Sequence, residues 1–231
     1  MLLSPAEWEA LRLSLAVALR SVGMSLPVAI LIAWLLARRR FPGRTLFNAF
    51  VHLPLVLPPV AVGYVLLLVF GIHGPLGGWL DRSLGIRLAF TTSGAVLATA
   101  VMSFPLMVRA MRLSLESVDP RLEEAARTLG AGPLDRFATV TLPLMMPGVL
   151  AGLVIAFSAG LGEFGAVITF ASNIPGETRT LPLALYTALQ TPNGDAEAAR
   201  LATVSFALGF IGLGASEWLG RRFMRRIAEP A

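Results

Sequence analysis

The sequence predicts an all-α integral membrane protein with about five transmembrane helices. Hydrophobic residues make up 55% of the 231 residues, and charged residues only 14%. A soluble globular domain carries about 25% charged residues, so this composition excludes an ordinary soluble fold. Several apolar segments also reach the roughly 20 residues that a membrane-spanning helix needs.

Five apolar segments are the expected spans. They cover residues 17–37, 46–70, 89–111, 144–171 and 198–219. Pro54, Pro58 and Pro59 interrupt the second segment, which predicts either a plain kink or a broken span that lines a transport path. The apolar segment 181–190 is too short to cross a bilayer, so we expect it to be re-entrant or interfacial.

The distribution of arginines predicts the orientation of the chain. All 19 cationic side chains are arginines, and most follow the first span, lie between the third and fourth spans, or follow the fifth. The positive-inside rule places these three regions in the cytoplasm and the N-terminus outside. The expected organisation is an extracytoplasmic tail at 1–10, a transmembrane domain at 11–220 and a basic cytoplasmic tail at 221–231. The same distribution explains the net charge of +5 without a nucleic-acid partner.

The segment between the third and fourth spans, residues 112–143, predicts a small helical elbow in the cytoplasm. Asp119 is placed to cap a short helix starting at Pro120. Glu123 and Arg127 lie four residues apart on this helix and are expected to pair.

The end of this helix is also predicted from local signals. Gly130 is expected to stop it in a left-handed conformation, and Gly132-Pro133 breaks the chain before a second short helix. Leu142-Pro143 and Pro147-Gly148 are expected to turn the chain back into the membrane. The alanine-rich surface of the elbow suits close docking of a partner that must push on the spans.

This elbow resembles the EAA motif of ABC-importer permeases. The motif is EAA, three residues, Gly, nine residues, Ile or Val, one residue and Leu-Pro. The matching residues are Glu124, Ala125, Ala126, Gly130, Val140, Leu142 and Pro143. The resemblance implies that this loop couples to the ATPase subunit, and that its first helix seats in a groove of that subunit.

A second resemblance concerns most of the chain. Residues 53–67 and 161–190 are similar to the molybdate permease subunits of ABC importers, and the similarity extends over 11–219. It implies a type I ABC importer transmembrane domain in the bacterial cytoplasmic membrane. The implied partners are two ABC ATPase subunits on the cytoplasmic side, a periplasmic molybdate-binding protein and membrane lipid. A five-span bundle has little room for a closed path, so we expect a homodimer with the path at its twofold interface.

The residue types that are missing limit the chemistry. The chain has no lysine and therefore no P-loop, so ATP hydrolysis is expected on a separate polypeptide and this chain is not an enzyme. It also has no cysteine, and His52 and His73 lack the companions of a metal site. No cofactor is expected.

Glu163 is the only acidic residue deep in an expected span. Together with Phe164, Gly165, Pro58 and Pro59 it forms the candidate pathway or gate. An intramembrane carboxylate is a functional candidate, but one facing the path would repel a dianion. A structural or gating role, with Arg20 as a candidate partner, is therefore favoured over direct contact with substrate.

Three alternative functions remain open at this level. A sulfate, thiosulfate or tungstate permease would share the same architecture, because these substrates are also tetrahedral oxyanions. A stand-alone secondary transporter would usually be larger and carry internal repeats. A membrane-embedded enzyme would need a set of polar partners around Glu163, which the sequence does not provide. Neither of the last two explains the EAA-like loop.

Overall fold

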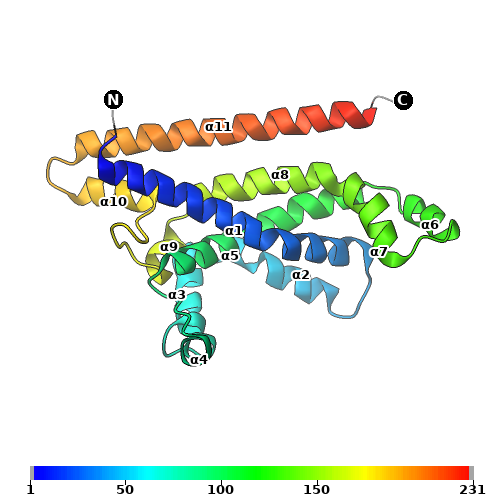
Figure 1. The fold of residues 1–231 in the computed structure, drawn as a ribbon, viewed down its shortest axis with the longest axis horizontal. Helices are drawn as coiled ribbons and strands as arrows, with labels where there is room; N and C mark the ends of the chain where they lie inside the picture. Colours follow the sequence, from blue (N-terminus) through cyan, green and yellow to red (C-terminus); the bar gives the residue numbers. More distant parts are fainter. Residues whose placement is uncertain (1–2, 229–231) are drawn as a thin grey trace.

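The protein is a bundle of long, nearly parallel and antiparallel helices. The computed structural model describes the backbone of residues 3–228, and the side chains of that range except 213 and 216–228. Four long helices run side by side in Figure 1: α1 (Pro5–Arg38), α5 (Thr92–Glu116), α8 (Leu142–Leu161) and α11 (Asp195–Ala228). The shorter elements are α2 (Arg44–His52), η1 (Leu53–Leu55), α3 (Pro59–Phe70), α4 (Pro75–Leu84), α6 (Arg121–Thr128), α7 (Pro133–Arg136), η2 (Phe137–Thr141), α9 (Gly165–Phe170) and α10 (Leu181–Gln190).

Three helices of the described part are long and apolar enough to cross a membrane: α1, α5 and the continuous helix Pro133–Leu161. A bent pair, Arg44–Leu55 with Pro59–Phe70, adds a fourth candidate if it is counted as one span. The expected fifth span, 198–219, lies within α11. The side chains at its end, and those of the basic tail 221–231, lie outside the described residues, so five spans remain a prediction.

The expected second span is broken rather than merely kinked. Its two halves meet at an angle of 110°. Pro58 is extended, with φ −55° and ψ 132°, because the proline that follows it disfavours a helical conformation. Pro59 then begins α3, a position where a missing backbone N–H costs nothing. As a result, α3 and α4 project sideways from the bundle (Figure 1).

Small residues bring α5 and α8 close together. A Cβ on Gly152 would lie 3.1 Å from the carbonyl oxygen of Met107. Gly148 faces Ser114, whose hydroxyl accepts a 3.2 Å hydrogen bond from the Gly148 N–H. The Gly148–Gly152 pair is thus a close-packing motif between helices, as its spacing predicts.

Buried polar contacts hold the start of α1. Ser4 and Glu7 form a capping box there. Glu7 is 1% exposed and accepts a 2.8 Å ion-pair contact from Arg200 of α11. Ser14 accepts a 2.6 Å bond from the Leu181 N–H and so docks α10. The segment 181–190 forms the short helix α10, which packs against α1 and α11; its expected re-entrant or interfacial position stays a prediction.

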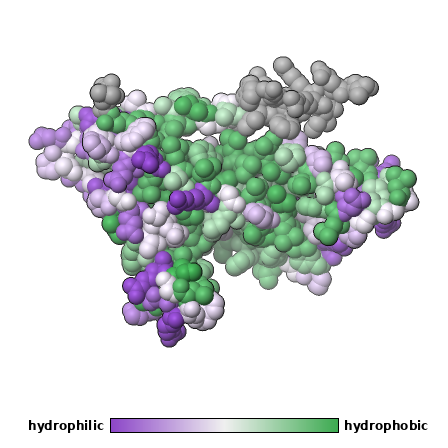
Figure 2. All heavy atoms as spheres, in the orientation of Figure 1, coloured by the Kyte–Doolittle hydropathy of each residue, from purple (hydrophilic) through white to green (hydrophobic). Residues whose placement is uncertain are grey.

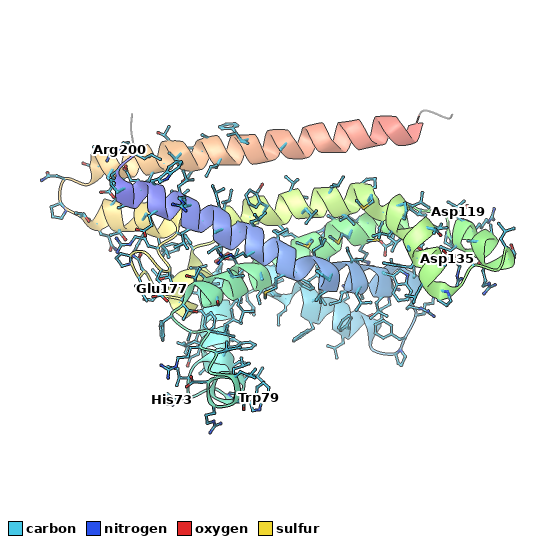
Figure 3. All side chains as sticks on the ribbon, in the orientation of Figure 1. His73, Trp79, Asp119, Asp135, Glu177 and Arg200 are labelled. Atoms are coloured by element: carbon cyan, nitrogen blue, oxygen red, sulfur yellow. The ribbon has the colours of Figure 1, made fainter. Side chains whose placement is uncertain are left out.

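The surface has the pattern of a membrane protein. In Figure 2 a broad hydrophobic area covers the long helices, and hydrophilic residues gather at both ends of the bundle and on α4. Figure 3 shows Asp119 and Asp135 at one end, and Glu177 and Arg200 at the other. The end that carries α6 and α7 also holds the Arg38 end of α1, two regions that the charge distribution predicts to share a side of the membrane.

Candidate functional site

The predicted elbow exists and forms one tip of the molecule. The Asp119 carboxylate accepts a 2.9 Å bond from the N–H of Arg121, the first residue of α6, which begins one residue after the expected start at Pro120. Gly130 has φ +88° and ends the helix, while the Ala131 N–H donates to the Ala126 carbonyl at 3.0 Å. The second short helix, α7, follows Gly132 as expected. The sequence therefore predicts the conformation of this elbow from its local signals.

The outer surface of the elbow combines exposed apolar side chains with charges of both signs. Glu124 and Ala125 are exposed, and Ala126 is partly buried. Leu129 and Leu134 are 88% and 85% exposed. These exposed leucines make the elbow a candidate contact surface.

Two expectations for the elbow are wrong. Glu123 pairs with Arg38 of α1 at 2.9 Å and not with Arg127. The chain does not turn at Leu142-Pro143, because Pro133–Leu161 is one continuous helix through α7, η2 and α8. Pro143 lies in the first turn of α8 and Pro147 within it, and the change of direction occurs earlier, at Gly130 to Gly132. A π-helical turn, η2, ends at Thr141, directly before Leu142-Pro143, and the Leu142 N–H donates to the Phe137 carbonyl.

The five candidate pathway residues lie away from the elbow. They lie where the break in the second expected span meets the break in the fourth. The helix of the fourth expected span ends at Leu161, and α9 begins at Gly165. A Cβ on Gly165 would lie 2.7 Å from the Cβ of Pro59, the first residue of α3. A Cβ on Gly63 would lie 2.7 Å from the Ala166 carbonyl. Two segments about a hundred residues apart are thus in backbone contact.

Glu163 caps the short helix α9. Its Oε1 accepts a 2.9 Å hydrogen bond from the Ala166 N–H. Arg20 is exposed, and within the described residues it makes no ion pair with Glu163. The expected Arg20 partner is therefore wrong, because a backbone amide takes its place. The Phe164 ring packs against Tyr186 of α10, with ring centroids 5.1 Å apart.

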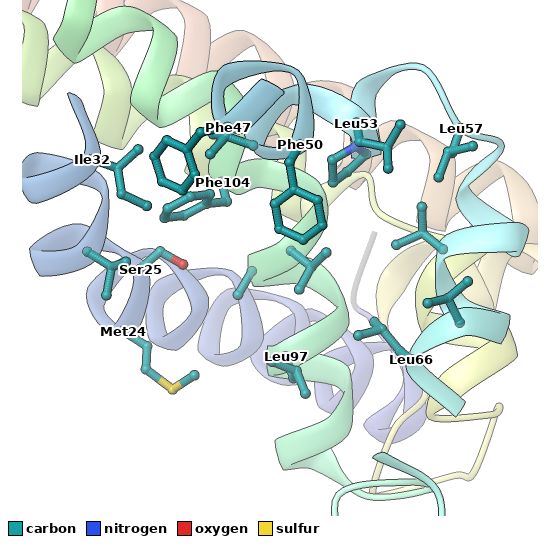
Figure 4. A pocket seen from close by; sticks show the side chains of 17 residues that line it. Met24, Ser25, Ile32, Phe47, Phe50, Leu53, Leu57, Leu66, Leu97 and Phe104 are labelled. Carbon is teal, nitrogen blue, oxygen red and sulfur yellow. The ribbon is translucent and has the colours of Figure 1, made fainter. Parts of the chain in front are cut away.

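An apolar groove lies between this place and the elbow. Its accessible volume is about 590 Å³, and α1, α2, α3 and α5 line it (Figure 4). Phe47, Phe50 and Phe104 point into it, and nearly all of the lining is apolar. Apart from the Ser25 hydroxyl, the lining side chains offer no hydrogen-bond donor for an oxyanion. In the described part of the chain, no group of three His, Cys, Asp or Glu residues could hold a metal ion.

Two long-range ion pairs could not be predicted from the sequence. The Arg38–Glu123 pair and the Glu7–Arg200 pair join residues 85 and 193 positions apart. Arg38 stands in a cluster of four arginines, which the charge distribution already explains by membrane orientation. Nothing local singles it out, so only the folded chain identifies it.

A family model agrees with this architecture. The model of the binding-protein-dependent transport system inner membrane component matches residues 25–225. The chain belongs to this family. Membership confirms the resemblance seen in the loop, and it implies an ATPase and a binding protein as partners in an ABC importer.

Individual relatives indicate which group of permeases within this family the chain resembles. The molybdenum transport permease ModB of Escherichia coli (strain K12) is 58% identical over 221 residues, which cover 96% of each chain. ModB of Haemophilus influenzae is 52% identical and covers 96% of this chain and 97% of its own. The sulfate permease CysT of E. coli is 39% identical over 86% of this chain and 71% of its own.

Solved structures share the fold at low sequence identity. A bacterial ABC transporter that imports alginate matches 98% of this chain and 81% of its own, with a TM-score of 0.72 and 18% identity. The inward-facing methionine ABC transporter matches 94% of each chain, with a TM-score of 0.67 and 17% identity. The all-helical fold is therefore that of an ABC importer membrane subunit.

Proposed function

We propose that this chain is the permease subunit of an ABC importer that carries molybdate into the cell, driven by ATP hydrolysis on a separate ATPase subunit. The observation that carries the proposal is the similarity to molybdenum permeases over nearly the whole length of both chains. Similarity to the sulfate permease is lower and covers less of either chain. Sulfate, thiosulfate and tungstate are the competing substrates.

The experiment is complementation in two bacterial strains, one lacking its molybdenum permease and one lacking its sulfate permease. We expect the chain to restore uptake of radiolabelled molybdate in the first strain, and unlabelled tungstate to compete. It should not restore sulfate uptake in the second. Restored sulfate uptake without molybdate uptake would contradict the proposal.

The assembly is a homodimer with two ATPase subunits and a periplasmic molybdate-binding protein. The exposed leucines of the elbow, together with Glu124, Ala125 and Ala126, supply the surface that seats in the ATPase. Leu142 and Pro143 lie at the start of α8 and connect this surface to a span. The protein lies in the bacterial inner membrane with its N-terminus outside and the basic tail 221–231 in the cytoplasm.

Alternating access supplies the mechanism. ATP binding draws the two ATPases together, and each elbow moves with the subunit it touches. The motion rocks the spans between inward-open and outward-open states, and the binding protein releases molybdate into the outward-open cavity. Pro58 and Pro59 together with residues 163–165 are the candidate gate, because both segments are broken there and can change angle where Gly165 approaches Pro59.

Substitutions of Glu163 test whether its side chain serves only as a hydrogen-bond acceptor at the start of α9 or whether its negative charge is needed for gating. Glu163→Gln keeps an oxygen that can accept from the Ala166 N–H, so we expect uptake close to that of the unchanged protein. Glu163→Ala removes the cap at a cost of about 1 kcal/mol, and uptake should fall several-fold. Initial uptake rates, normalised to the amount of assembled complex, are the measurement. An equal loss in both variants would show that the charge itself is needed.

A further inference from the structure

Arg38 joins the last turn of α1 to the elbow. Its Nε donates to Oε1 of Glu123 in α6 at 2.9 Å. Its Nη2 donates to the carbonyl oxygen of Val118, at the entry to the elbow, at 3.1 Å. One guanidinium therefore holds both the helix α6 and the chain that leads into it. A planar guanidinium is suited to this double contact, because its N–H groups point in fixed directions.

A third segment reaches the same carboxylate. The Thr141 hydroxyl donates to Oε1 of Glu123 at 3.1 Å, and Thr141 is 2% exposed. Thr141 is the last residue of η2, directly before α8. Glu123 thus lies between the end of α1 and the start of α8 and bonds to both.

The surroundings of Arg38, Glu123 and Thr141 strengthen the contacts among these three side chains. The side chains of Arg38 and Glu123 are only 12% and 21% exposed, so water screens their attraction far less than at the surface. Beside them, Trp34 of α1 packs edge-on against Phe137 of η2, with ring centroids 6.3 Å apart. The same two elements that Glu123 bridges are therefore also in aromatic contact.

We infer that Glu123, Arg38 and Thr141 form a brace that transmits movement of α6 into α1 and α8. The inference rests on the proposed function, in which the ATPase moves α6. A helix of eight residues on a glycine hinge could swing without moving the spans. The brace prevents this, because α6 cannot rotate away without breaking a partly buried ion pair. Glu123 and Arg38 are positioning residues that touch neither ATP nor the transported anion.

The opposite end of α1 has a comparable pair. Glu7 and Arg200 join α1 to α11 with an N–O distance of 2.8 Å, and no residue of the elbow takes part. This pair provides a control for the loss of any partly buried ion pair in the same helix. Arg40 provides a second control, because it is exposed and belongs to the same basic cluster as Arg38.

The test compares Arg38→Gln, Glu123→Gln and Thr141→Val in the complex reconstituted with the ATPase and binding protein. The measurement is molybdate transported per ATP hydrolysed. We expect the two charge variants to lower this ratio by about fivefold or more, the size of an ordinary coupling between sites. Thr141→Val should give a smaller loss. The Thr139→Val control removes a hydroxyl that bonds only within its own helix, and it should change nothing.

The controls separate coupling from folding. Arg40→Gln should leave the ratio unchanged, and Glu7→Gln should reduce the amount of complex but not the ratio. The double variant Arg38→Glu with Glu123→Arg should recover part of the ratio, because an ion pair can form again. An unchanged ratio in the assembled Arg38→Gln and Glu123→Gln complexes would overturn the inference.

A second readout does not depend on the transported substrate. The chain has no cysteine, so a single nitroxide label can be placed on Thr128→Cys at the exposed end of α6. Glu123→Gln should increase the mobility of this label, and the charge-reversed pair should reduce it again. If the label responds in this way but the unchanged complex carries no molybdate, the proposed function fails and the brace stands. A label that does not respond contradicts the brace whatever the substrate.

Discussion

Replacing Gly130 by valine is expected to uncouple ATP hydrolysis from uptake while the protein still inserts and assembles. Gly130 has φ +88°, a left-handed conformation that costs a residue with a side chain roughly 1–2 kcal/mol, and a β-branched residue more. The end of α6 would rearrange, and the hydrogen bond from Ala131 to Ala126 would be lost. The proposed docking surface around Glu124 and Leu129 would then move relative to the spans.

Gly132 provides the matched control for this prediction. A Cβ at either glycine meets no atom within 4 Å, so steric space does not distinguish the two positions. Gly132 has φ −68°, which valine adopts freely. Gly132→Val should therefore transport normally, with the ratio of uptake to ATP hydrolysis as the measurement. Gly130→Pro should be at least as severe as Gly130→Val, because proline cannot reach positive φ. Normal uptake by Gly130→Pro would refute the coupling role.

Replacing Gly165 by valine is expected to cause the other large loss of uptake. Its new Cβ would lie 2.7 Å from the Cβ of Pro59 and 3.2 Å from the Val60 nitrogen. The neighbours are ring and backbone atoms, which cannot turn aside as a flexible side chain would. Overpacking of this kind costs about 1–3 kcal/mol. A free-energy change of about 1.4 kcal/mol alters an equilibrium constant tenfold, so uptake should fall by roughly tenfold or more.

Gly162 provides the control for Gly165. It tests whether the loss of uptake comes from the close approach of α9 to Pro59 or from any larger side chain in the break between α8 and α9. It lies in the same break, it is exposed, and the nearest atom to a Cβ placed there would be the Ala159 carbonyl oxygen at 3.8 Å. Gly162→Val should transport at nearly the normal rate. Uptake rates and the amount of detergent-stable complex should be measured together for both variants. Equal losses at the two glycines would show that contact between α3 and α9 is not the cause.

Local chemistry made much of the elbow predictable. The hydrogen bond from Arg121 to Asp119 at the start of α6 and the left-handed stop at Gly130 depend on residues a few positions apart, so the sequence alone determined them. Pro58 and Pro59 likewise determined that the second apolar segment breaks, because a proline restricts its own backbone and that of the residue before it. The angle of 110° at the break depended on packing against α9 and could not be predicted.

The partners of the charged residues were decided only by the tertiary structure. Helical spacing predicts Arg127 for Glu123, yet an exposed pair of that kind contributes only a few tenths of a kcal/mol. Folding brings Arg38 from 85 positions away into a less exposed site, where the same charges attract more strongly. Glu163 shows the reverse case, because a nearby backbone N–H replaced a distant arginine.

The amino-acid sequence by itself determined that this chain is a membrane protein, that its second apolar segment breaks at Pro58-Pro59, and that a helical elbow with a stop at Gly130 follows α5. These features follow from composition and from short-range backbone rules. Only the tertiary structure decided how the elbow is attached to the spans and which broken segments meet. Such contacts join residues far apart in the chain, and no local preference encodes which distant residues become neighbours.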